Sequence, residues 1–311
     1  MMVPAALLLL GALTAALGPR LLARADWPDR EPVVALWAWQ CVVAAVLLSC
    51  ALSMTLSAAA AWQAVRGHVF GTAPRAVVDA YALGTAGSWA APIAVALACG
   101  GVWSLAMLVR QVLRARSRRR ARRDELLERA PLLPGEEPDG GRLVVLEDDR
   151  PDAWRLPGAA PRLVVTTAAL TRLKGRQLDA LLAHEQGHAQ ARHDWLLHCS
   201  AALAEGFPRV PVFAAFRDEM HRLVELAADD TASRRFGRLT TALALVGLNE
   251  DRGVFGPSPT PQAHVPQRVH RLLTPPDRLP ALHRLRLTAV AALVPVVPVL
   301  VALVPVLRAL G

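Results

Sequence analysis

Cysteine is scarce in this chain, and its placement excludes two classes of site. The cysteines are Cys41, Cys50, Cys99 and Cys199, and no two of them form a CxxC pair. Three of them lie inside apolar stretches. We therefore expect neither a disulfide framework nor a cysteine-rich zinc site, and the thiols are predicted to be small buried side chains.

Lysine is rarer still, since Lys174 is the only one among 35 basic residues. The 26 acidic residues leave a net charge of +9, an excess that is typical of nucleic-acid-binding proteins when it forms a surface patch. Here the arginines crowd beside a hydrophobic run, where positive charge orients a membrane protein. We therefore predict no direct contact with nucleic acid.

Charge of either sign is missing from four long runs, at 1–19, 32–65, 80–109 and 287–307. Each run reaches the ~20 residues that a helix needs to cross a hydrocarbon core ~30 Å thick. A mean hydropathy of +0.31 agrees with a chain that is partly embedded in a lipid bilayer. We predict four membrane spans, at about 2–19, 33–57, 86–109 and 287–307.

The first run has a second interpretation, because Ala23-Arg24-Ala25 is similar to the cleavage site of a signal peptide. No positive region precedes the apolar stretch, and Arg20 and Arg24 follow it instead. A retained span is therefore the preferred interpretation.

An arginine cluster sets the predicted orientation of these spans. It follows the third run and consists of Arg110, Arg114, Arg116, Arg118, Arg119, Arg120, Arg122 and Arg123. Positive side chains beside a span stay in the cytoplasm. The protein is thus predicted to be a multi-pass protein of the cell membrane, with 111–286 in the cytoplasm and both termini outside.

The fourth run contains Pro295, Pro298 and Pro305. Proline removes a backbone donor from a helix and clashes with the preceding turn. We expect a kink in this span.

Between the arginine cluster and the fourth run the composition becomes that of a soluble domain. Segment 131–141 is rich in proline, glycine and acid, which is typical of a linker. The predicted division is three spans in 1–110, a juxtamembrane segment and linker in 111–141, a cytoplasmic domain in 142–284 and the fourth span. Within the domain, Leu143–Leu146 and Leu163–Thr167 are predicted strands.

A helical pattern from Arg176 to Arg192 contains the motif HEQGH. Residues four apart lie one above the other on a helix, so the imidazoles of His184 and His188 project from one face and can bind one zinc ion. Glu185 is then placed to take a proton from water at the metal. A surface helix with polar residues is the simpler alternative.

A second helical pattern, from Val212 to Arg234, offers a third ligand. Glu225 and Asp229 share a face of this helix because they are four residues apart. Glu225 can complete three protein ligands, while Asp229 accepts the free ring N–H of a zinc-bound histidine. Two solvated acids on an exposed helix are the alternative.

These features resemble the BlaR/MecR-like membrane metallopeptidases. The most specific part is WRLPGAAPRLVVTTAALTRLKGRQLDALLAHEQGHAQARH, followed by the ExxxD helix and framed by four spans. The resemblance implies an α-helical membrane protein with an α+β zincin-like cytoplasmic metallopeptidase domain between spans three and four. It implies one Zn²⁺ per chain held by His184, His188 and Glu225, with Glu185 as general base and Asp229 as partner of a ligand.

The resemblance also implies a protein substrate in the cytoplasm, such as a BlaI-like transcriptional repressor or the chain itself. The antibiotic sensors of that family continue into an extracellular penicillin-binding domain, whereas this sequence stops at Gly311. We therefore do not expect the polypeptide alone to sense β-lactams. By analogy, an edge strand formed by Leu163, Val164, Val165 and Thr166 is expected to pair with the substrate.

Two alternatives stay open at this point. One is a peptidase similar to the HtpX and CAAX-protease group, which acts in membrane-protein quality control or processing. The other is a zinc-binding scaffold without activity, against which the presence of Glu185 argues. His193, His198 and His221 are interpreted as solvated or locally bonded side chains rather than ligands, because His193 follows His188 by five residues and not by six.

Overall fold

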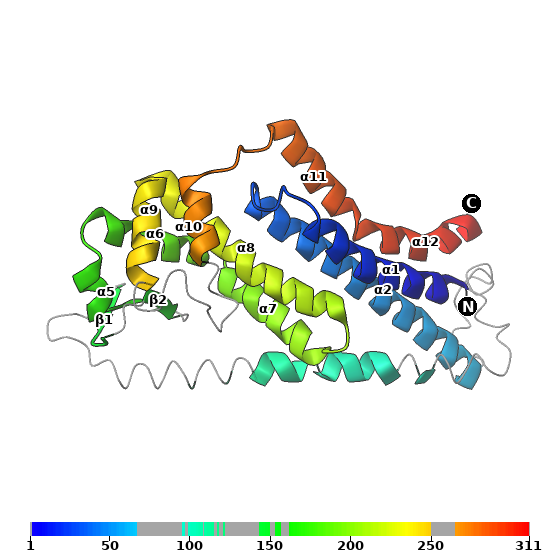
Figure 1. Cartoon of the computed structure of the whole chain (residues 1–311). Coiled ribbons are helices and arrows are strands. Elements are labelled where there is room, and N and C mark those ends of the chain that lie inside the picture. Colours follow the sequence, from blue (N-terminus) through cyan, green and yellow to red (C-terminus); the bar gives the residue numbers. More distant parts are fainter. Residues whose placement is uncertain are drawn as a thin grey trace.

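Two long helices begin the chain in the computed structural model, which describes residues 2–66, 95–96, 99–107, 109–114, 117, 121, 143–149, 153–156, 162–249 and 265–310. These helices are α1 (Met2–Ala23) and α2 (Pro32–Arg66), which lie side by side and antiparallel (Figure 1). Both are long and apolar enough to cross a membrane.

Small residues let α1 and α2 approach each other closely. A Cβ atom added at Gly11 would lie 3.0 Å from Cβ of Ser49, and one added at Gly18 would lie 2.7 Å from a methyl group of Val42. Membrane helices associate through such close contacts, because lipid supplies no hydrophobic drive between them.

The other two predicted spans differ in how much of them is described. Half of the third, predicted at 86–109, lies outside the described residues, and 99–107 and 109–114 are described as helix at and beyond its end. The fourth is a pair of helices, α11 (Ala281–Leu293) and α12 (Val296–Leu310), which are bent by 42° at Pro295. The kink is thus where the prolines predict it. The described residues contain two candidate spans, or three if this pair counts as one.

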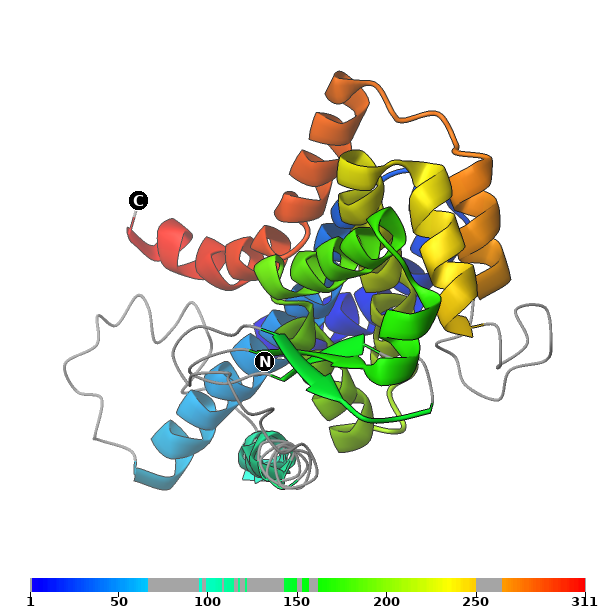
Figure 2. The ribbon, with the colours of Figure 1, turned by 90° about the vertical axis from the view of Figure 1, so that its left-hand side faces the viewer.

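A small sheet precedes the helices of the predicted domain. β1 (Leu143–Leu146) pairs in parallel with β3 (Arg162–Thr166), and β2 (Ala153–Leu156) pairs antiparallel with the other side of β3. Figure 2 looks at the end of the molecule that carries this sheet.

The position of β3 corrects one prediction. It is the middle strand of the sheet, so both of its backbone edges are already paired. The predicted edge strand at Leu163, Val164, Val165 and Thr166 is wrong for this reason. Within the described part of the sheet, β2 lies at an edge and contacts α6.

Helices α5 to α10 follow the sheet and surround the candidate site. They are α5 (Thr167–Arg172), α6 (Arg176–Gln190), α7 (His193–Gly206), α8 (Pro211–Phe236), α9 (Arg238–Asn249) and α10 (Val265–Leu273). The helices α6 and α8 match the two that the sequence predicts. The pair α7 and α8 extends alongside α1 and α2 (Figure 1).

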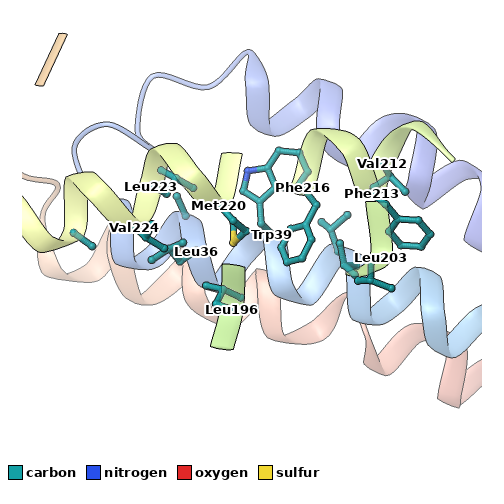
Figure 3. Packing of buried hydrophobic residues seen from close by; sticks show 14 of the residues in the cluster. Leu36, Trp39, Leu196, Leu203, Val212, Phe213, Phe216, Met220, Leu223 and Val224 are labelled. Carbon is teal, nitrogen blue, oxygen red and sulfur yellow. The ribbon is translucent and has the colours of Figure 1, made fainter. Parts of the chain in front are cut away.

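The spans and the domain share one hydrophobic core. The buried face of α2, which includes Trp39, packs against apolar side chains of α7 and α8 (Figure 3). The rings of Trp39 and Phe216 have centroids 6.4 Å apart. The two regions that the sequence analysis separates, 1–110 and 142–284, are therefore joined by side-chain packing.

Replacing Leu223 by alanine tests this shared core, because Leu223 is fully buried in it on α8. We expect a loss of about 2–5 kcal/mol of stability, the usual cost of a buried leucine truncation. Thermal unfolding of the detergent-purified protein measures it. Leu239→Ala on α9, where the side chain is 62% exposed, is the control and should change the midpoint little; equal shifts for both variants would contradict the packing.

Candidate metal centre

The two histidines of HEQGH point the same ring nitrogen at one spot. Both lie on α6, and their Nε2 atoms are 3.1 Å apart. Glu225 of α8 approaches the same spot, with Oε1 3.5 Å from Nε2 of His188 and Oε2 3.6 Å from Nε2 of His184. The structure thus brings together the three predicted ligands.

The spacing of these atoms fits zinc. Zinc binds nitrogen and carboxylate oxygen at ~2.0–2.1 Å in a tetrahedron, which places neighbouring ligand atoms ~3.3 Å apart. The two Nε2 atoms are 3.1 Å apart, and each lies 3.5 or 3.6 Å from a different oxygen of the Glu225 carboxylate. One ligand atom from each of the three residues lies within 4.8 Å of the other two. Among the described residues, His184, His188 and Glu225 form the one group of histidine, cysteine or acidic side chains with metal-ligand spacing.

A glycine inside the motif allows α6 and α8 to come this close. A Cβ atom added at Gly187 would lie 3.2 Å from Cβ of Thr231 and 3.5 Å from Cα of Ala228. A larger side chain would push the helix that carries the histidines away from the helix that carries Glu225.

Asp229 is placed behind His184, as its position in the sequence predicts. Its Oδ1 lies 3.0 Å from Nδ1 of His184, on the side of the ring opposite the candidate metal position. Burial by itself would lower the pKa of His184, but the carboxylates of Asp229 and Glu225 raise it to about 10. Zinc binding therefore has to displace a proton from this ring.

His193 contacts the candidate site, although it was not predicted from the sequence to be part of it. It is buried, and its Nδ1 lies 3.0 Å from Nδ1 of His188. Burial lowers its pKa to about 4, so the neutral ring can accept the N–H of His188. The chain reaches this position through Arg192, whose φ of 53° turns α7 sharply back from α6.

Arg268 of α10 lies behind both carboxylates and has no counterpart in the sequence analysis. Its Nε and Nη2 donate to the two oxygens of Asp229 at 2.8 and 2.7 Å. Its Nη1 lies 2.8 Å from Oε2 of Glu225. Burial opposes ionisation of these acids, but Arg268 and the histidines hold the pKa of Glu225 well below its usual range and that of Asp229 at about 2.

The remaining candidates are placed as follows. Glu185 is half-buried on α6, and its charge helps to raise the pKa of Arg268 against the opposing effect of burial. His198 and His221 are not part of the metal-spaced group, as the sequence analysis expects. His221 does line the same cavity as Glu225.

That cavity has a volume of about 890 Å³ and lies between the α1–α2 connector, α8 and α10. Its wall includes Ala25, Asp29, His221, Glu225, Arg268 and Arg271. The connector is held there by Asp29, whose carboxylate pairs with Arg222 and whose backbone carbonyl accepts a 2.7 Å hydrogen bond from Nε of Arg271. The space beside the metal ligand is therefore closed partly by the segment that joins the first two spans.

Two helical histidines, a glutamate between them and a glutamate from a following helix form the pattern that is typical of zinc-dependent peptidases of the HExxH type. The comparisons with known proteins agree. Residues 115–272 match the model of Peptidase family M48, and the chain belongs to this family.

One curated relative is the Plastoglobule-localized metallopeptidase 48, chloroplastic, of Arabidopsis thaliana, which is 37% identical over 90 residues. The match covers 28% of this chain and 25% of the relative, so the chain spans about a quarter of that protein. No solved structure matches the chain significantly. The family match shows a Peptidase family M48 domain; it does not identify the BlaR/MecR-like subfamily, which stays a prediction.

The titration of the histidines predicts how the metal-free protein responds to pH. The pKa of His184 rises from 6.5 to about 10 on folding, so its contribution to stability is full below pH 6.5 and is lost towards pH 10. Burial lowers the pKa of His188 and His193 from 6.5 to about 4, so the folded protein disfavours their charged forms. These two rings therefore leave the stability unchanged above pH 6.5 and lower it as the pH falls towards 4.

We therefore expect the unfolding midpoint of EDTA-treated protein to be highest near pH 6.5, the unfolded value of these rings. His184→Asn should remove the decline on the alkaline side only. A midpoint of the wild type that stays flat above neutral pH would contradict the buried pair of His184 and Asp229.

Replacing His193 by phenylalanine tests the contact with His188, because the ring volume is kept while Nδ1 is lost. We expect zinc affinity to fall by about 10–100-fold, the usual effect of removing the partner of a metal-bound histidine. Competition with a chelator measures it. His198→Phe on the same helix should leave the affinity near that of the wild type.

Proposed function

We propose that this protein is a membrane-embedded endopeptidase with one zinc ion held by His184, His188 and Glu225. The observation that carries the proposal is the convergence of the two Nε2 atoms, 3.1 Å apart, on the carboxylate of Glu225, whose two oxygens lie 3.5 and 3.6 Å from them. The partners behind the ligands support it, because each histidine has its other nitrogen engaged, His184 by Asp229 and His188 by His193.

Zinc bound at this position would supply a Lewis acid for the attacking water and for the scissile carbonyl. Glu185 follows His184 directly in α6 and acts as the general base, taking a proton from the water and delivering it to the leaving amine. Asp229 keeps His184 in the tautomer that leaves Nε2 free for the metal.

We further propose that the site faces the cytoplasm and that both termini lie outside the cell. The positive residues beside the third predicted span support this orientation. So does the arrangement of the elements, since the two termini lie at one end of the helices while the sheet, α9 and α10 lie at the other (Figure 1).

The first candidate substrate is a cytoplasmic protein such as a BlaI-like transcriptional repressor, or the chain itself. It rests on the resemblance of the HEQGH segment and on the framing by spans. The described contacts give no support for a partner other than a protein substrate and the lipid bilayer.

A second candidate is a membrane protein that is processed close to the bilayer, as in the HtpX and CAAX-protease group. The cavity favours it, because the wall beside Glu225 is built partly from the connector between two spans. A substrate that enters there passes the membrane ends of α1 and α2.

The peptidase reaction is tested by Glu185→Gln in detergent-purified protein. We expect stoichiometric zinc in both proteins but a loss of cleavage of at least about 100-fold in the variant, the usual contribution of a general base. Fluorescent casein and a purified BlaI-like repressor serve as substrates. Full activity of the variant would contradict the role of Glu185, and zinc without cleavage in the wild type would favour the inactive scaffold.

A further inference from the structure

Arg268 contacts both a candidate metal ligand, Glu225, and Asp229, which is the partner of the candidate ligand His184. It lies in α10, outside HEQGH and outside the helix of Glu225. We propose that Arg268 is a positioning residue of the metal centre: it fixes the carboxylates of Glu225 and Asp229 and offsets their charge. The inference rests on the proposed zinc site.

The geometry uses the shape of the guanidinium group. Two parallel donors engage both oxygens of Asp229, and the third nitrogen faces Oε2 of Glu225 at 2.8 Å. One planar group therefore sets the angle between two carboxylates that stand one helical turn apart on α8. A lysine ammonium cannot do this, since it is a compact charge without a fixed fork.

The buried negative charge of Asp229 requires a positively charged partner. Asp229 is almost fully buried, with a side chain 2% exposed, and Arg268 is 8% exposed. A buried carboxylate without a counterion carries a large desolvation penalty. Among the described residues, Arg268 is the arginine whose nitrogens lie within hydrogen-bonding distance of both oxygens of Asp229.

The backbone of α10 is held more by α9 than by direct contact with α6 or α8, the helices that carry the candidate ligands. Val265 and Leu272 of α10 pack against Ala242 and Leu245 of α9 in a separate small core. This core holds the backbone of α10, so the guanidinium group reaches the carboxylates from a fixed base. Removing the side chain therefore releases Glu225 and Asp229 without removing the helix.

Arg271 provides a matched control on the same helix. It lies three residues after Arg268, and its Nη1 pairs with Asp230 at 2.8 Å rather than with Asp229. Its Nε donates to the backbone carbonyl of Asp29. Arg271 thus has the same chemistry and nearly the same burial, but it contacts no candidate ligand and no partner of one.

The experiment compares Arg268→Lys, Arg268→Gln and Arg271→Gln in the full chain in detergent. Zinc affinity is measured by chelator competition, and kcat and KM are measured on fluorescent casein. We expect Arg268→Lys to keep the fold but to lose about 10–100-fold in zinc affinity and in kcat, with KM within about twofold. Arg268→Gln should lose more, and Arg271→Gln should match the wild type in zinc affinity. Its kcat is not used as a control, because Arg271 lines the cavity beside Glu225.

A double-mutant cycle with Asp229→Asn separates positioning from general stability. If Arg268 acts through Asp229, the effects of the two substitutions on zinc affinity are less than additive, because the partners share one interaction. Additive effects, wild-type zinc affinity in Arg268→Lys, or an equal loss of zinc affinity in Arg271→Gln would overturn the proposal. Weakened zinc binding in Arg268→Lys together with no casein cleavage by the wild type would leave the positioning role and refute the peptidase.

Discussion

The placement of a buried carboxylate, Asp229, and a half-buried one, Glu225, beside two histidines is the constraint on which the rest of this structure depends. Glu225 and Asp229 are drawn into the interior by the close approach of α6 and α8 at Gly187. Once there, they need positive charge and donors, which His184 and Arg268 supply. The helix α10, which packs against α9 in the small core, therefore has a defined place in the fold, because it carries Arg268, the counterion of the two carboxylates.

The helix α8 connects this charged centre with the candidate membrane helices α1 and α2. Its face with Phe216 and Leu223 packs against α2, while Glu225 and Asp229 project towards α6 and α10. Both contacts fall within four turns of one helix, so the same element packs against α2 and carries the candidate ligand Glu225. The link through Asp29, Arg222 and Arg271 strengthens this coupling, because it ties the connector of the spans to α8 and α10.

The predictions from the sequence succeeded where the signal was local and periodic. The spacing of four residues in HEQGH and between Glu225 and Asp229 is a property of any helix, and the long uncharged runs of α1 and α2 are sufficient in themselves to indicate spans. The kink at Pro295 follows from the missing donor of proline. The strand β2 was not predicted, because its four residues, which include Arg155, show no clear alternation of apolar and polar side chains.

The sequence by itself determined which residue types can bind zinc, which helix faces carry them and where the first spans lie, because these depend on neighbours along the chain. Only the tertiary structure decided that β3 is the middle strand and that α2 and α8 share a core. The same holds for the contact of His193 with His188 across a left-handed turn, and for Arg268, which reaches Asp229 from 39 residues away. Such partners are set by how helices pack in space, and no periodicity of a single helix encodes them.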